Sequence, residues 1–209
     1  MKIYLIRHGE TKWNKESRYQ GVKDVPLSEK GIEQVKRLGR YFSGLPLDII
    51  VSSPLSRTKE TADYIVNFYP KELQVFYDKR FLEISHGLWE GKVVDEVKEE
   101  FKEIYDFWKT KPYEAKMPEG EGLHDVSLRA TSAFKEWVGK YKGKDIAFVT
   151  HDVVIRVIMM DIFSLPYDFF WKFKLANAGI NILEYEQDYK LLSINLVCHL
   201  EEFSAEGVI

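Results

Sequence analysis

The segment Lys2-Ile3-Tyr4-Leu5-Ile6-Arg7-His8-Gly9-Glu10-Thr11 begins with an apolar run and ends with charged and turn-forming residues. Its first part, Lys2–Arg7, predicts a buried strand that gives way to a loop where a guanidinium and an imidazole stand side by side. At such a position an imidazole can attack phosphorus, while an arginine holds phosphate oxygens in a matching fork. On its own the segment decides little, because a histidine after a strand is more often a hydrogen-bonded loop residue.

The same order of apolar strand, polar turn and helical pattern recurs twice, which is typical of a parallel sheet with crossover helices. The expected strands are residues 2–7, 47–52, 75–77 and 145–150. The expected helices begin at the caps Ser28, Ser53 and Asp152, with Pro54 as the first helical residue of the second.

The middle of the chain has a different pattern. Residues 93–108 and 126–138 carry apolar side chains at helical spacing, and 111–122 read as a loop rich in Pro, Gly and charge. Two final strands, Ile180–Tyr185 and 191–197, are expected to form a hairpin or two strands of the sheet. The predicted fold class is therefore α/β: a doubly wound, mostly parallel sheet flanked by helices, with a helical lobe inserted in mid-chain, in one domain spanning 1–209.

Composition limits the classes of function. The net charge of -3, with 30% charged residues of both signs, argues against a nucleic-acid protein and a polybasic membrane surface. No apolar run reaches the ~20 residues of a membrane span, so we expect a soluble, cytoplasmic protein. Cys198 is the only cysteine, which excludes an internal disulfide or a multi-thiolate metal site, and we expect it to be a small buried side chain.

Four side chains fall at the carboxyl ends of the expected strands, where open α/β sheets bind ligands. Arg7 and His8 follow the first strand, Arg57 lies in the helix after the second, and His151 follows the later one. Singly, Arg57 could be a solvated helix-start residue and His151 a loop-capping imidazole. Together they predict a cationic pocket suited to a phosphate.

These residues belong to a series of motifs that resembles the histidine phosphatase superfamily, in its phosphoglycerate-mutase-like branch. In chain order the motifs are Arg7-His8-Gly9-Glu10-Thr11 with Asn14, Arg18-Tyr19-Gln20-Gly21 with Asp24, Pro26-Leu27-Ser28 with Gly31, Ser52-Ser53-Pro54 with Arg57, Thr58 and Thr61-Ala62, then Glu83, Gly87, Gly91, Gly120 and Thr150-His151. One departure is Asp152, where relatives commonly have glycine; this carboxylate could cap a helix or narrow the pocket.

The resemblance implies a role for each matching position. It implies that His8 is phosphorylated, that Arg7, Arg57 and His151 bind the phosphate, and that Glu83 donates the proton. Residues Asn14, Gln20 and Gly21 match positions that line the substrate site. Neither a metal ion nor another cofactor is expected. We further expect a neutral His8, a protonated His151, and a Glu83 that apolar surroundings keep protonated.

Two details resemble the metal-independent phosphoserine phosphatases of this superfamily: His86, three residues after Glu83, and the tail that starts at Cys198 and runs to Phe203. They imply hydrolysis of phosphoserine, a place in serine biosynthesis, and contact of His86 with the substrate carboxylate. Relatives are often dimers, so a homodimer is a further expectation.

Other functions stay open at this point. A broad-specificity phosphatase, or one acting on α-ribazole phosphate, sugar phosphates or glycosylated phosphoglycerate, would use the same pocket. A phosphoglycerate mutase is less favoured, because resembling mutases carry a longer, more basic segment after the acidic residue. A silent binder of phosphorylated ligands would need neither His8 nor Glu83.

Overall fold

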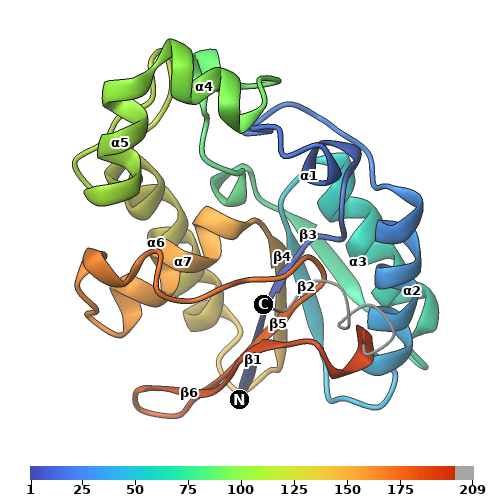
Figure 1. Ribbon diagram of the computed structural model, residues 1–209. Coiled ribbons are helices and arrows are strands. Elements are labelled where there is room, and N and C mark those ends of the chain that lie inside the picture. Colours follow the sequence, from blue (N-terminus) through green and yellow to red (C-terminus); the bar gives the residue numbers. More distant parts are fainter. Residues whose placement is uncertain (201–209) are drawn as a thin grey trace.

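The protein, described for residues 1–200 by a computed structural model, is built on one mixed sheet of six strands in the order β3-β2-β4-β1-β5-β6 (Figure 1). The strands are β1 (Lys2–Arg7), β2 (Ile49–Ser52), β3 (Gln74–Tyr77), β4 (Ile146–Thr150), β5 (Ile180–Tyr185) and β6 (Tyr189–Leu196). The first four are parallel, whereas β5 runs antiparallel to β1 and β6 antiparallel to β5. The predicted fold class and the predicted hairpin are confirmed.

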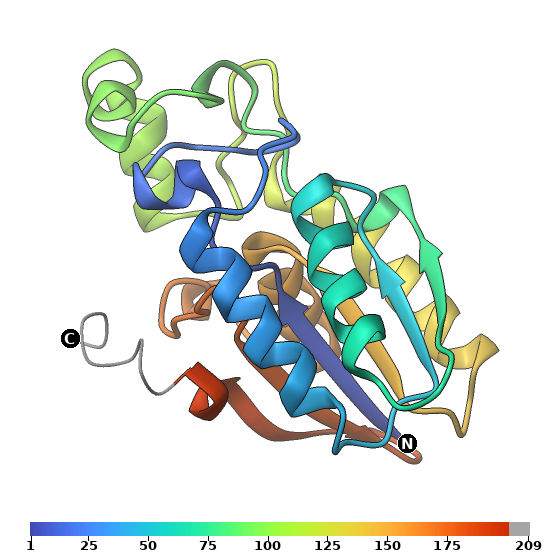
Figure 2. The same cartoon turned by 90° about the vertical axis from the view of Figure 1, so that its right-hand side faces the viewer.

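Helices cover both faces of the sheet. They are α1 (Lys12–Lys15), α2 (Glu29–Phe42), α3 (Ser56–Phe68), α4 (Val94–Glu100), α5 (Lys102–Thr110), α6 (Leu123–Lys140) and α7 (Asp152–Ile162). Figure 2 shows α2 and α3 side by side on one face, while α6 and α7 lie on the other. The lobe of α4 and α5 stands apart from the sheet, at the top of Figure 1.

The alternation of side chains along β1 explains this layering. Ile3 and Leu5 point into the core shared with α6 and α7, whereas Tyr4 and Ile6 point into the core shared with α2 and α3. Because successive side chains of a strand face opposite ways, an apolar run without alternation must be buried on both sides. No helix within residues 1–200 combines the length and apolar character needed to cross a bilayer.

The start of α3 differs from the sequence prediction. The helix begins at Ser56, two residues later than Pro54, and Leu55 at its N-cap offers no capping side chain. Asp24 caps from a distant loop instead, because its Oδ1 accepts from the backbone N–H of Ser56 at 2.8 Å. The Ser53 hydroxyl is not available as a cap, since it lies 2.9 Å from Nε2 of His151.

Three smaller expectations were also wrong. His151, not Asp152, occupies the N-cap position of α7. The helical section 93–108 is broken at Phe101, whose φ of -127° and ψ of 37° end α4 and begin α5 in a new direction. Cys198 is exposed instead of buried; of the tail expected to approach the substrate, Glu201 to Phe203 lie outside the described residues.

A glycine in α2 lets the loop after β1 pack directly against this helix. The backbone of Glu10 passes so near Gly31 that a Cβ at this position would collide with the Glu10 carbonyl oxygen. That carbonyl also accepts from the N–H of Ser28 at 2.8 Å. The loop that carries His8 is therefore seated on the start of α2.

Candidate active site

Strand register brings the two histidines together. In the parallel pair β1 and β4, Arg7 lies opposite Thr150, so the next residue of each strand leaves the sheet at the same edge. The N–H of His8 donates to the Thr150 carbonyl at 3.1 Å. The rings of His8 and His151 then meet edge to face, with 5.2 Å between their centroids.

A cavity of about 300 Å³ opens above these rings. Eight of the nine site residues predicted from the sequence line it: Arg7, His8, Asn14, Gln20, Gly21, Arg57, Glu83 and His86. The ninth, His151, is fully buried beneath His8. The end of β1, α1 with the loop after it, the starts of α3 and α7, and the stretch before α4 thus form one pocket, at the place where strand ends were expected to converge.

The hydrogen bond of His8 fixes its tautomer. Nδ1 lies 2.7 Å from the carbonyl oxygen of Gly9, which only accepts, so Nδ1 carries the proton and Nε2 keeps its lone pair. Burial, then the charges of Arg57 and Arg7, lower the pKa of His8 well below its usual value. The ring is neutral at physiological pH, as a nucleophile requires.

Three buried nitrogens around His8 have no hydrogen-bond partner within residues 1–200. They are Nε of Arg7, Nε of Arg57 and Nδ1 of His151. An unsatisfied buried polar group costs about 1–3 kcal/mol, so a cluster of them at one point calls for an explanation. An anion in the cavity would supply acceptors to the two guanidinium N–H groups and to the imidazole.

The arginines are held in place by backbone oxygens. Nη1 and Nη2 of Arg57 donate to the carbonyls of Lys23 and Gly21, both at 2.8 Å, and Nη1 of Arg7 donates to the carbonyl of Leu175 at 2.6 Å. Burial lowers the pKa of Arg57 to about 10, so it remains charged at neutral pH. Each guanidinium keeps further N–H groups for a ligand.

His151 was predicted to be protonated, but its surroundings favour the neutral ring. Burial, followed by the charges of Arg57 and His8, lowers the pKa of His151 well below its usual value. The ring is therefore neutral in this structure. Only a negative charge placed beside it would raise this pKa again.

The carboxyl group of Glu83 has the environment expected of a proton donor. Oε1 accepts from the N–H of Ile84 at 3.0 Å, and Oε2 faces the N–H of Val153 at 3.5 Å. Burial and the charge of Asp152 raise its pKa to about 7, against the opposing effects of the Ile84 N–H and the two arginines. Much of this carboxyl group is thus protonated at neutral pH.

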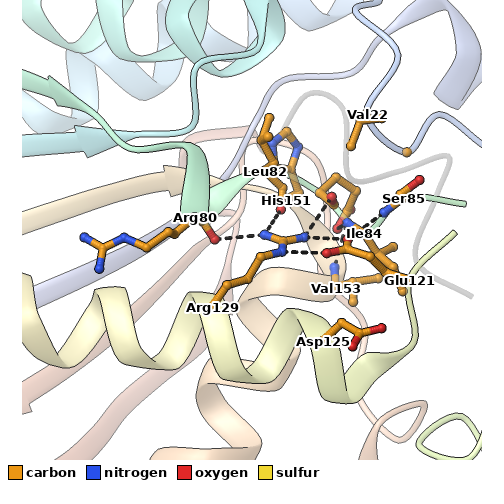
Figure 3. A network of polar contacts seen from close by, with 12 residues as sticks. Val22, Arg80, Leu82, Ile84, Ser85, Glu121, Asp125, Arg129, His151 and Val153 are labelled. Carbon is orange, nitrogen blue, oxygen red and sulfur yellow. Dashed lines mark hydrogen bonds and ion pairs between the residues drawn. The ribbon is translucent and has the colours of Figure 1, made fainter.

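An arginine of α6 fixes the segment that carries Glu83 (Figure 3). Arg129 donates to the carbonyl oxygens of Arg80, Leu82 and Glu83 at 2.8, 2.6 and 3.0 Å. It also pairs with Glu121, which in turn accepts from the N–H of Ser85 at 2.9 Å. We call Arg129 and Glu121 the backbone clamp. The sequence analysis missed it, because its backbone partners lie 36 to 49 positions away in the sequence and meet it only in the tertiary structure.

The loop with Gln20 and Gly21 is tied to the opposite wall. Gly21 has a φ of +55°, and a Cβ there would collide with the carboxylate of Glu90. That carboxylate accepts from the N–H groups of Val22 and His86, at 3.0 and 3.1 Å. Asn14 is oriented by Asn177, which donates to its Oδ1 at 3.1 Å.

His86 lies in an aromatic surrounding made by Tyr19, Trp89 and Trp108. Burial lowers its pKa to about 3, so it is neutral, and its Nδ1 has no hydrogen-bond partner within the described residues. The outer wall contains further residues that the sequence analysis did not single out, among them Lys109 and Trp171. Lys109 follows the predicted helical stripe 93–108 and Trp171 lies outside every predicted element, so the sequence gave no sign that they face a cavity.

Within residues 1–200, no group of three or more His, Cys, Asp or Glu side chains is placed to hold a metal ion.

Residues 3–196 match the family described as the histidine phosphatase superfamily, branch 1. Phosphoserine phosphatase 1 of Hydrogenobacter thermophilus is 35% identical over 208 residues, which cover 99% of this chain and 98% of that protein. Among solved structures, YhfR of Bacillus stearothermophilus is similar with a TM-score of 0.90 and 32% identity, covering 95% of this chain and 98% of that one. A mutant phosphoserine phosphatase of Entamoeba histolytica in complex with phosphoserine is similar with a TM-score of 0.81, 29% identity and the same coverage.

Proposed function

The chain belongs to branch 1 of the histidine phosphatase superfamily and is a phosphatase, and we propose that it hydrolyses O-phosphoserine through a phosphohistidine formed on His8. The family is the one that the sequence motifs predicted. The observation that carries the proposal is the set of three nitrogens without a partner in residues 1–200, on Arg7, Arg57 and His151, around a neutral imidazole.

Phosphate binding comes first. The guanidinium groups of Arg7 and Arg57 and the ring of His151 offer donors to the phosphate oxygens, and the charge of the bound dianion favours a proton on His151. A loose transition state spreads negative charge over these same oxygens, so fixed donors stabilise it without having to reorganise. In this scheme the side chains provide the positive charge that many phosphatases take from a metal ion.

Two chemical steps follow. In the first, Nε2 of His8 forms a bond to phosphorus as the bond to the ester oxygen breaks, and Glu83 gives its proton to the leaving alkoxide. In the second, Glu83 takes a proton from water, the resulting hydroxide attacks phosphorus, and His8 leaves with its lone pair restored. Phosphate and an alcohol are the products, and both side chains return to their starting forms.

Phosphoserine is proposed as substrate because of two similar proteins and because of the position of His86. The 35% identical relative is named a phosphoserine phosphatase, and a solved relative carries phosphoserine. His86 lies in the cavity wall as a neutral ring, and we assign it a hydrogen bond to the substrate carboxylate. A broad-specificity phosphatase is the alternative that the same pocket would serve.

A screen of phosphomonoesters in chelator tests the substrate. We expect kcat/KM for phosphoserine to exceed that for phosphothreonine, 3-phosphoglycerate, α-ribazole phosphate and sugar phosphates by at least about tenfold, a difference of about 1.4 kcal/mol in transition-state binding. A smaller preference would contradict phosphoserine and favour the broad-specificity enzyme. His86→Ala should weaken phosphoserine turnover more than that of an aryl phosphate; equal losses would remove His86 from the substrate site.

Trapping of the intermediate tests the chemistry. During turnover of ³²P-labelled phosphoserine, quenching in base should leave acid-labile, base-stable phosphate on the protein, and His8→Ala should abolish it. Failure of the unaltered protein to acquire label, together with absent turnover, would instead favour a binder of phosphorylated ligands.

A further inference from the structure

The carboxylate of Asp152 lies in the cavity wall but has no part in the proposed phosphoryl transfer. Apart from Glu83, it is the only carboxylate among the described residues that line the cavity. It is the first residue of α7, and its side chain is 21% exposed. A carboxylate offers no attraction to a phosphate dianion, whereas it attracts a positively charged group, so its place in the wall points to a ligand that also carries a positive charge.

The neighbours of Asp152 fix it without using up its capacity to accept hydrogen bonds. Arg156 donates from Nε to Oδ2 at 3.0 Å and from Nη2 to Oδ1 at 3.3 Å, while Nη1 of Arg7 lies 3.8 Å from Oδ1. Arg156 is itself anchored, because its Nη1 donates to the carbonyl oxygen of Phe173 at 2.7 Å. A carboxylate offers about four lone-pair sites, so a rigidly held acceptor remains open to the cavity.

The position of Asp152 relative to Glu83 shows which part of a substrate it would meet. Glu83 faces the N–H of Val153, the next residue along α7. The charge of Asp152 also contributes to the raised pKa of Glu83, which agrees with their closeness. Since Glu83 must reach the ester oxygen, Asp152 lies beside the first atoms of the leaving group and away from the far end of the pocket.

We propose that Asp152 binds the ammonium group of an amino-alcohol phosphate, here the α-ammonium of phosphoserine, and selects it over a hydroxyl at the same carbon. Two carbon atoms separate this nitrogen from the ester oxygen, which matches the adjacency of Asp152 and Glu83. The inference rests on the proposed function for the placement of the phosphate. It makes Asp152 a specificity-determining residue that distinguishes phosphoserine from 3-phosphoglycerate, which carries a hydroxyl in place of the ammonium group.

Equilibrium binding to a protein that cannot turn substrate over tests this selection. On a His8→Ala background, calorimetry gives the Kd of phosphoserine and of 3-phosphoglycerate with and without Asp152→Asn. We expect Asp152→Asn to reduce the preference for phosphoserine by about tenfold or more, the size of one hydrogen bond to a charged group. The matched control Asp63→Asn removes an exposed carboxylate of α3 and should leave the ratio of the two Kd values unchanged.

An unchanged ratio in the Asp152→Asn protein would overturn the proposal, even if both ligands bound more weakly, because loss of support for Arg7 affects both phosphates alike. If the Asp152→Asn variant does not fold, the His8→Ala protein can still test the proposal, by comparison of its affinities for two smaller ligands. It should bind phosphoethanolamine about tenfold more tightly than 2-hydroxyethyl phosphate, and equal affinities would overturn the proposal. Failure of the proposed function is recognised by a different result: the protein with His8 intact would show no turnover of phosphoserine or no phosphohistidine.

Discussion

The carboxyl group of Glu83 sets the pH range in which the leaving group can be protonated. Its pKa of about 7 means that the proton is present below neutral pH and lost above it. We therefore expect kcat/KM for phosphoserine to decline on the alkaline side with an apparent pKa near this value. Glu83→Gln has no proton to transfer, so kcat should fall ~10²–10⁴-fold, measured by phosphate release across pH.

The matched control for this substitution is Glu33→Gln, which makes the same chemical change at an exposed position of α2 and should keep full activity. An aryl phosphate has a better leaving group and depends less on protonation, so its loss in Glu83→Gln should be smaller. Equal losses for phosphoserine and the aryl phosphate would argue against Glu83 as the acid.

The same carboxyl group also affects stability. In the unfolded chain Glu83 titrates near its ordinary value of 4.5, but in the folded protein near about 7. Between these values the unfolded state releases a proton that the folded state keeps, so the free energy of unfolding falls as pH rises, by on the order of 3 kcal/mol. Glu83→Gln should raise Tm relative to the unaltered protein at about pH 8 and not at about pH 4; a Tm that is lower at both would contradict this account.

Sequence alone identified which side chains could act, but not their protonation or their supports. His8, Arg57 and Glu83 were named from strand ends and motifs, and the structure brings them into one cavity. The neutral state of His151 could not be predicted, because it follows from burial and from charges that come from other elements. Asp152 was expected either to cap a helix or to narrow the pocket. It lies in the cavity wall, and His151 occupies the N-cap position instead.

The clamp between α6 and the segment 80–85 gives Glu83 its fixed position. Arg129 to Lys keeps the charge but loses the planar fork that binds three carbonyl oxygens and Glu121 together. We expect kcat for phosphoserine to fall about 10–100-fold with a much smaller change in KM, because a misplaced acid affects the transition state more than substrate binding. Steady-state kinetics of the purified variant measure both.

Two comparisons separate positioning from simple loss of stability. Arg40→Lys makes the same change on the surface of α2 and should leave kcat and Tm nearly unchanged. If Arg129→Lys lowered Tm but kept kcat at temperatures where it is folded, the clamp would be structural only. A loss confined to KM would likewise contradict a role in placing Glu83.

Helices and strands were predicted correctly where local sequence signals are strong. The predicted ends of an element were wrong where a residue distant in the sequence determines them. The strands β1 and β5 match their expected ranges because their apolar runs are bounded by polar residues. The start of α3 moved because Asp24, from another loop, supplies the cap. The short helix α1 was missed, although Thr11 and Asn14 form a capping box that a search for such pairs could have found.

The charges that hold the phosphate come entirely from side chains in the proposed mechanism, so turnover should not depend on a divalent cation. We expect kcat/KM for phosphoserine to stay within about twofold after dialysis against EDTA, since no step needs a Lewis acid. Assays with and without added Mg²⁺, Mn²⁺ and Zn²⁺ measure this. A loss in EDTA that one of these ions restores would show that the mechanism is incomplete.

The outer edge of β6 bears on the expected homodimer. Within residues 1–200 this strand ends the sheet order, and Leu191, Leu192 and Ile194 are 43%, 48% and 41% exposed. An open edge with apolar side chains is a template for a second strand. We predict a dimer by light scattering that Leu192→Lys converts to a monomer, whereas Leu128→Lys on α6 does not; a monomeric unaltered protein would contradict this.

The two walls of the cavity have separate origins in the fold. The phosphate-facing wall comes from the ends of β1, β2 and β4, whereas Val94, Trp108 and Lys109 of the α4–α5 lobe and Trp171 form the outer wall. Divergence in the lobe can therefore alter which esters are accepted while leaving the phosphoryl chemistry intact. A laboratory selection for a new leaving group should accumulate its substitutions in this lobe and at Asp152, and spare Arg7, His8, Arg57 and His151.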